Sequence, residues 1–147
     1  MKIDILTLFP EMFMPLKTSI LKRAQDKNLI EINIINFREF AKNKHSQVDD
    51  VPFGGGNGMV LMCQPIFDCI NSIKTNKSKI IYMSPRGKTL KQNMIKNYLN
   101  FEHIIILCGH YEGVDQRVID YFDMEEISIG DYVLTGGELP SMVFVDC

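Results

Sequence analysis

The most constraining feature of the sequence is the regular alternation of strand-like and helix-like patterns along 147 residues. Short stretches rich in Ile, Leu and Val predict strands at 2–8, 29–37, 79–83, 103–108 and 126–129. Apolar residues at three- and four-residue steps predict helices from residue 10 to about 24, over 64–73, over about 89–99 and over 114–122. This alternation predicts a single α/β domain with a parallel sheet flanked by helices.

Composition excludes several other classes of protein. With 46% hydrophobic and 23% charged residues, the chain is neither disordered nor fibrous. No apolar run approaches the roughly 18 to 20 residues of a membrane span, and Met1 leads directly into a strand-like stretch instead of a signal peptide. The four cysteines have no paired spacing, which favours free thiols over disulfides. We therefore expect a cytoplasmic protein with no membrane partner.

The loops that follow three predicted strands are the expected location of a binding site. In parallel sheets, ligands bind beyond the carboxyl ends of the strands. The loops 84–88, 109–113 and 129–137 all follow such ends, so we expect them to converge.

The stretch 49–59, with sequence DDVPFGGGNGM, is the first loop of unusual composition. Its four glycines, Gly54, Gly55, Gly56 and Gly58, allow either a lid over a ligand or a flexible surface turn. It lacks the Gly-Lys-Ser/Thr ending of a P-loop, and no GxGxxG motif follows a strand. A nucleoside triphosphate or dinucleotide site is thus not indicated.

The stretch 128–140, with sequence SIGDYVLTGGELP, is the second such loop. Gly130, Gly136 and Gly137 allow the backbone to approach a flat heterocycle closely, and Tyr132 and Leu134 can supply apolar walls. A tight structural turn is the alternative.

A dense group of polar residues, His110, Tyr111, Glu112, Asp115 and Arg117, follows the predicted strand at 103–108. They indicate a functional loop, although Asp115 and Arg117 also suit a helix cap with an ion pair. His110 and Glu112 have no evident third ligand, so a metal cage is not indicated. No role is assigned to His45 or His103.

Charge is sorted along the chain despite a net charge of −2. Seven basic residues and no acid lie between Lys74 and Lys96, whereas nine acids and only Arg117 lie between His110 and Cys147. The basic block is either a surface for a polyanion or an ordinary solvated face.

Together these motifs resemble one family. The loops 49–59, 108–117 and 128–140, the opening KIDILTLFPEMF and the stretch YMSPRG at 82–87 are similar to the bacterial tRNA (guanine-N1)-methyltransferases of the TrmD family, members of the SPOUT class. The match runs from the first residue to the last. His110 stands where some members have Arg, and Phe53, Asn57 and Gln116 also depart from the usual pattern.

This resemblance implies a fold, an activity and a set of partners. It implies a SPOUT domain over 1–147 with a C-terminal trefoil knot, and a homodimer that acts on tRNA. The implied reaction transfers a methyl group from S-adenosylmethionine to N1 of the guanosine immediately 3′ of the anticodon, at position 37.

The resemblance also implies site residues. Cofactor binding is expected at Tyr82, Met83, Ser84, Pro85, Gly109, Ile129, Gly130, Asp131, Tyr132, Val133, Leu134, Gly136 and Gly137. Glu112 is expected to help with a divalent ion such as Mg²⁺, and the glycines of the 49–59 loop with a lid or tRNA contact.

In the family, an Asp acts as the base and an Arg stabilises the charge that builds on O6 of the guanine. Both residues lie beyond the GGELP segment. They and the C-terminal tRNA-binding domain are not among these 147 residues, so we expect cofactor binding with little or no methyl transfer. A standalone binding module and a nucleotide-binding regulator are the competing hypotheses.

The helix opening at Pro140 has only about two turns, so a frayed end and a weakened dimer are also expected.

Overall fold

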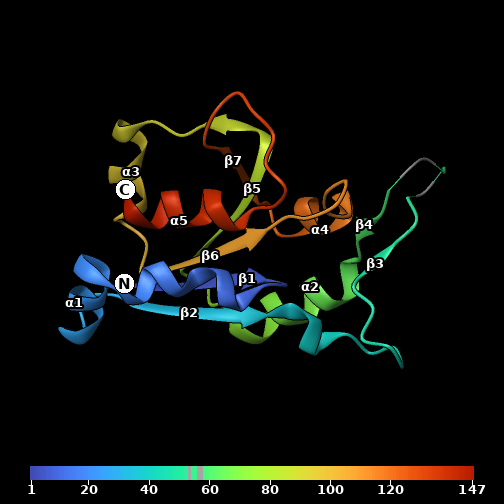
Figure 1. Ribbon diagram of the computed structural model, residues 1–147, viewed down its shortest axis with the longest axis horizontal. Helices are drawn as coiled ribbons and strands as arrows, with labels where there is room; N and C mark the ends of the chain where they lie inside the picture. The colour runs from blue at the N-terminus through green and yellow to red at the C-terminus, as the bar shows by residue number, and fades with distance from the viewer. Residues whose placement is uncertain (53, 56–57) are drawn as a thin grey trace.

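The computed structural model describes residues 1–52, 54–55 and 58–147 and shows an α/β architecture (Figure 1). A five-stranded sheet has the order β2-β1-β6-β5-β7, and every neighbouring pair is parallel. Its strands are β1 (Lys2–Thr7), β2 (Glu31–Asn36), β5 (Ser78–Thr89), β6 (His103–Cys108) and β7 (Glu125–Ser128). The predicted fold class, a parallel sheet flanked by helices, is confirmed at this level.

A small antiparallel pair lies apart from the main sheet. It consists of β3 (Asp49–Asp50) and β4 (Val60–Leu61), which project from the body of the molecule in Figure 1. The loop predicted at 49–59 therefore begins with one very short strand.

Side chains of the central strands alternate between two cores, one on each face of the sheet. Ile105 and Leu107 face a core with the helices α2 (Cys63–Ile73) and α4 (Gln116–Tyr121) and the 3₁₀ helix η2 (Phe37–Phe40). Ile104 and Ile106 face a second core with the 3₁₀ helix η1 (Pro10–Lys17), α3 (Gln92–Tyr98) and α5 (Glu138–Asp146). The continuous apolar run of β6 reflects burial on both faces, which is typical of a central parallel strand.

The helix predicted from residue 10 to about 24 is two helices. The 3₁₀ helix η1 ends at Lys17, Thr18 is extended, and α1 (Ser19–Asp26) follows. Pro15 has no N–H to donate, which disfavours a continuous α-helical ladder. As a result Phe13 and Leu16 are buried, whereas Ile20 is 69% exposed and does not share their face.

The strand predicted to stop at Ser84 also differs. Strand β5 continues to Thr89, with a register shift between Met83 and Lys88 against β7. Pro85 cannot donate a ladder hydrogen bond, so the chain leaves the ladder and rejoins it. The departing residues, 84–87, are free to line a site at the sheet edge.

The last helix is better anchored than its length suggests. Helix α5 begins at Glu138, two residues before Pro140, and runs to Asp146. Ser141 is fully buried, and its hydroxyl lies 3.1 Å from the Cys108 Sγ atom of β6. Phe144 packs edge-on against Tyr98 at a ring separation of 5.0 Å. The expected fraying is therefore not seen, because packing compensates for the short helix.

The fold mixes the charges that are sorted in the sequence. Lys77 pairs with Glu102 at 2.6 Å, and Lys79 pairs with Glu125 at 2.8 Å. The Lys74 ammonium lies 4.9 Å from the centre of the Phe122 ring. The first half of the basic block thus has local partners, and a polyanion surface there is weaker than the sequence indicates.

Two other observations bear on the sequence interpretation. All four cysteines are free, and Cys69 and Cys108 are buried. Within the part of the chain that the structure describes, no helix has the length and apolar character needed to span a bilayer.

Candidate functional site

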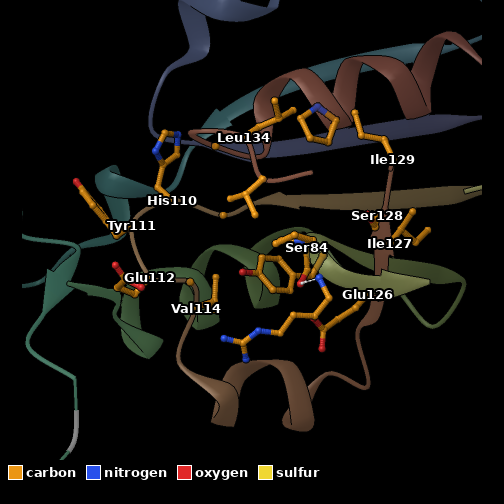
Figure 2. Close-up of a pocket in the computed structure, with 18 of the residues that line it drawn as sticks. Ser84, His110, Tyr111, Glu112, Val114, Glu126, Ile127, Ser128, Ile129 and Leu134 are labelled. Carbon is orange, nitrogen blue, oxygen red and sulfur yellow. Dashed lines mark hydrogen bonds between the residues drawn. The ribbon is translucent and has the colours of Figure 1, made fainter. Parts of the chain in front are cut away.

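A pocket of about 500 Å³ lies at the carboxyl edge of the sheet (Figure 2). Its lining comes from the ends of β5, β6 and β7 and from the loops that follow them. The expected convergence of the loops 84–88, 109–113 and 129–137 is confirmed. The volume lies in the range of small-molecule sites, which is about 300 to 1,000 Å³.

The wall formed by the loop after β7 is apolar yet exposed. Tyr132, Val133 and Leu134 line the pocket with exposed fractions of 56%, 80% and 38%. Apolar side chains gathered in a concave surface are typical of sites that bury a ligand or a partner. This wall therefore suits a flat, partly apolar ligand.

Tyr82 lies at the base of the pocket. A Cβ atom on Gly109 would lie 2.9 Å from the Tyr82 hydroxyl, so a side chain at residue 109 would displace this ring. Burial raises the pKa of the Tyr82 phenol, and the nearby Glu126 carboxylate raises it further. The phenol is therefore neutral at physiological pH and presents an uncharged surface to a ligand.

Ten of the predicted site residues line the pocket: Tyr82, Ser84, Pro85, Gly109, Glu112, Ile129, Tyr132, Val133, Leu134 and Gly136. Gly130, Asp131 and Gly137 are not among the lining residues, although their neighbours in sequence are. The Met83 side chain points to the opposite face of the sheet and lies in the core with Phe144. Any contact of Met83 with a ligand would have to come from its backbone.

The described glycines of the 49–59 loop, Gly54, Gly55 and Gly58, do not line this pocket. Gly54, Gly55 and Gly58 all have positive φ, the backbone region that favours glycine. A Cβ on Gly58 would lie 2.5 Å from the Glu112 Cγ atom, so the two residues are in close contact. Gly56 lies outside the described residues.

Backbone hydrogen bonds attach the β4 segment to the loop that carries Glu112. The Leu61 N–H donates to the Gly113 carbonyl at 2.9 Å, and the Glu112 N–H donates to the Met59 carbonyl at 2.9 Å. Tyr111, in the same loop, has a left-handed φ of 58°, an uncommon conformation for a residue with a side chain. The β4 segment therefore holds this loop, which lines the pocket, at two points.

No group of three or more His, Cys, Asp or Glu side chains that could hold a metal ion occurs among the described residues. Glu112 therefore has no protein partners there that would complete a metal site.

Sequence reasoning assigned no role to several lining residues, among them Arg86, Gln116, Ile119, Glu126 and Thr135, and it placed His110 in a functional loop without a specific role. Figure 2 shows His110 and Leu134 in the upper part of the view, with Ser84 and Glu126 below them. Arg86 and Thr135 lie within the predicted loops, and that position was the available signal for them. Ile119 lies in helix α4 and Glu126 in strand β7, so their place in the lining depends on how these elements pack at the edge of the sheet.

Asp115 begins helix α4 as its N-cap, and its carboxylate accepts a hydrogen bond from the Arg117 N–H at 3.0 Å. The Arg117 guanidinium also donates to it at 2.6 Å. The alternative interpretation of these two residues, a helix cap with an ion pair, is thus what the structure shows.

We expect Asp115→Ala to lower the free energy of unfolding by about 1 kcal/mol through loss of the cap. Hydrogen bonds from the Arg117 side chain lower the pKa of the Asp115 carboxyl below its ordinary value of 3.8. The stabilisation is therefore complete at neutral pH and is lost as the pH falls below about 4 toward the folded-state pKa. Urea unfolding at pH 7 and pH 3 measures both effects. The exposed Asp120→Ala on the same helix should change stability by less than about 0.5 kcal/mol.

The parallel sheet covered on both faces and the pocket at its carboxyl edge define an α/β domain with a candidate ligand site. The model of the family tRNA (Guanine-1)-methyltransferase TrmD matches residues 1–147, so the chain belongs to this family.

Curated relatives agree with the family assignment. The chain is 58% identical over 151 residues to the tRNA (guanine-N(1)-)-methyltransferase of Ruminiclostridium cellulolyticum, covering 100% of the chain and 65% of the relative. It is 53% identical over 147 residues to the protein of that name from Macrococcus caseolyticus, covering 99% of the chain and 61% of the relative. It is 58% identical over 152 residues to that from Alkaliphilus metalliredigens, covering 99% and 62%. The chain thus spans less than two thirds of the length of these relatives.

Proposed function

We propose that the chain is the S-adenosylmethionine-binding domain of a tRNA (guanine-N1)-methyltransferase that methylates the guanosine at position 37. The observation that carries this proposal is the pocket, because the stretch 82–87 and the loops 108–117 and 128–140, which resemble the family, all contribute lining residues to it. The relatives at 53% to 58% identity that bear this enzyme name support it.

The pocket suits S-adenosylmethionine in size and in chemistry. Tyr132 and Leu134 offer apolar walls to a purine, and the backbone at Gly109 and Gly136 lines the same pocket. The bound cofactor would supply a methyl group on a sulfonium. The role of these residues is to hold that methyl group in line with the attacking nitrogen.

The remaining chemistry concerns the guanine. Its N1 carries a proton, so a carboxylate must accept that proton while a donor stabilises charge on O6. The Asp and Arg implied by the resemblance lie outside these 147 residues. We therefore assign cofactor binding, and no proton transfer, to the described pocket. We assign Glu112 no metal, because the described residues around it do not form a metal site.

The wider assembly is part of the same proposal. We infer a homodimer, because Tyr132 and Val133 of the pocket loop and Leu139 and Val143 of α5 are all exposed apolar side chains. We also infer a SPOUT trefoil knot, since the loop 129–137 returns to pack against the end of β6 at Gly109. The tRNA contacts would be shared with a C-terminal domain outside residues 1–147. We also infer that the protein acts in the cytoplasm.

Titration calorimetry with S-adenosylmethionine tests the central proposal. We expect saturable binding by the 147-residue chain, and a methyl-transfer rate near background on unmodified tRNA. Leu134→Lys should weaken binding at least about tenfold because it puts a charge on the apolar wall, roughly 1.4 kcal/mol. Leu99→Lys, at an exposed leucine beside α3 that does not line the pocket, is the control and should bind normally.

Absence of S-adenosylmethionine binding would refute the proposal and favour a nucleotide-binding regulator. Binding together with a normal turnover rate would refute only the assignment of proton transfer to residues outside 1–147. Equal weakening by the two lysine variants would show that the apolar wall is not the binding surface.

A further inference from the structure

A buried carboxylate joins three separate segments beside the pocket. Glu138, the first residue of α5, is 1% exposed. One of its oxygens accepts a hydrogen bond from the Thr7 hydroxyl at 2.7 Å, and the other lies 2.8 Å from the His110 Nε2 atom. The carboxylate therefore connects the end of β1, the loop after β6 and the start of α5.

Hydrogen bonds and the dipole of α5 stabilise the Glu138 carboxylate in its buried position. An unpaired buried carboxylate is costly, and both of its oxygens have partners here. Its place in the first turn of α5 also puts it near the positive end of the helix dipole. Thr7 is in turn held by the Phe9 N–H, which donates to the Thr7 hydroxyl at 2.9 Å. Thr7, Glu138 and His110 are therefore held in place by hydrogen bonds to one another and to the Phe9 N–H.

The loop 129–137 packs directly on this pair. A Cβ atom on Gly136 would lie 2.4 Å from the His110 Nε2 atom and 2.5 Å from the Glu138 Oε2 atom. Only glycine at residue 136 leaves room for the hydrogen bond between them. The His110 ring is also held by Phe9, at a ring separation of 4.8 Å.

His110 itself belongs to the pocket lining. Its side chain is 16% exposed, so a small part of the imidazole remains accessible. The imidazole therefore connects the buried Glu138 carboxylate to the loop 129–137, which it meets at Gly136.

From these contacts we infer that Glu138 and Thr7 are positioning residues that act through His110. They hold the imidazole in one orientation, and the imidazole supports the loop 129–137 in its ligand-binding conformation. This inference rests on the proposed function, since the ligand that reports on the loop is S-adenosylmethionine. It assigns a role to three residues, Thr7, His110 and Glu138, which were not among the cofactor-binding residues expected from the sequence.

A pair of substitutions at His110 tests this directly. The amide nitrogen of His110→Gln can occupy the place of Nε2 and donate to Glu138, whereas the shorter His110→Asn cannot reach it. We expect His110→Asn and Glu138→Gln each to weaken S-adenosylmethionine binding about tenfold in calorimetry, and His110→Gln to retain affinity within about threefold. The double variant of His110→Asn with Glu138→Gln should bind no more weakly than His110→Asn alone, because the two residues act as one unit.

The control is a similar pair at the other end of the sheet. Asp4 is fully buried, and its carboxylate lies 2.9 Å from the His103 Nε2 atom. We expect Asp4→Asn to lower the melting temperature at least as much as Glu138→Gln while leaving S-adenosylmethionine affinity unchanged. This comparison separates positioning from a general loss of stability.

Each outcome decides the matter. Unchanged affinity in His110→Asn and Glu138→Gln, with normal binding by the unsubstituted chain, would overturn the inference and leave the proposed function intact. Equal affinity loss in Asp4→Asn, or full additivity in the double variant, would also overturn it. No binding by the unsubstituted chain would overturn both the inference and the proposed function.

Discussion

Gly137→Ala should destabilise the protein by about 3 kcal/mol, which is large for the addition of one methyl group. The backbone at Gly137 has φ −84°, which any residue can adopt, so the cost is entirely steric. A Cβ there would lie 2.7 Å from the Cys108 Cα atom and 2.8 Å from the Gly109 nitrogen. These are backbone atoms of the central strand and its end, and they cannot move aside as a flexible side chain can.

The close approach at Gly137 also has a functional consequence. The Gly137 N–H donates to the Gly109 carbonyl at 2.9 Å, which fixes the loop 129–137 to the floor of the pocket. Pushing the chain away would break this bond and shift the start of α5. We therefore expect Gly137→Ala to reduce S-adenosylmethionine affinity as well, which thermal unfolding and calorimetry on the same sample measure.

Gly54→Ala is the informative control. Glycine is favoured at residue 137 by the lack of space for a Cβ and at residue 54 by its backbone conformation. Gly54 has φ +89° and open space where a Cβ would lie. Its substitution should cost only about 1 kcal/mol of backbone strain, with no effect on the pocket. A smaller loss for Gly137→Ala than for Gly54→Ala would show that the contact with β6 is loose.

Phe144→Ala should lower the free energy of unfolding by about 3 to 5 kcal/mol and release α5 from the sheet. Phe144 is 5% exposed and contacts Tyr98 edge-on in the core that also contains Met83. A helix of nine residues has little stability of its own, so the loss of its main apolar anchor should affect the whole element. Circular dichroism with urea unfolding gives the change in stability.

The matched control for Phe144→Ala is Ile20→Ala, an apolar side chain on α1 that is 69% exposed. It should change stability by less than about 0.5 kcal/mol. If the two substitutions cost the same, then α5 does not depend on burial of Phe144. The control also tests the observation that Ile20 lies outside the buried face predicted from its spacing.

Much of the architecture and site was predictable because it depends on local pattern. Alternating strands and helices predict a parallel sheet, and loops after parallel strands must lie at one edge. Ten of the predicted site residues, Tyr132 and Leu134 among them, line the pocket for that reason. Met83 was hard to place because neighbouring residues of a strand face opposite sides of the sheet, and its neighbours Tyr82 and Ser84 both line the pocket.

Other features depend on residues distant in sequence, and no local pattern encodes them. The sequence shows seven basic residues together, but Lys77 and Lys79 have acidic partners from later segments. His103 was left without a role, yet it is buried between Asp4 and Ser78. The register of β5 after Pro85 depends on β7, about forty residues later.

The sequence by itself determined the class of fold, the edge of the sheet where the pocket lies and the family. These follow from the alternation of apolar residues and from short motifs with fixed spacing. The tertiary structure alone decided that Glu138 is paired with Thr7 and His110, because those residues are 131 and 28 positions away. Such a pair forms only when separate segments are brought together and water is removed from between them, which makes burial, and not sequence proximity, its physical cause.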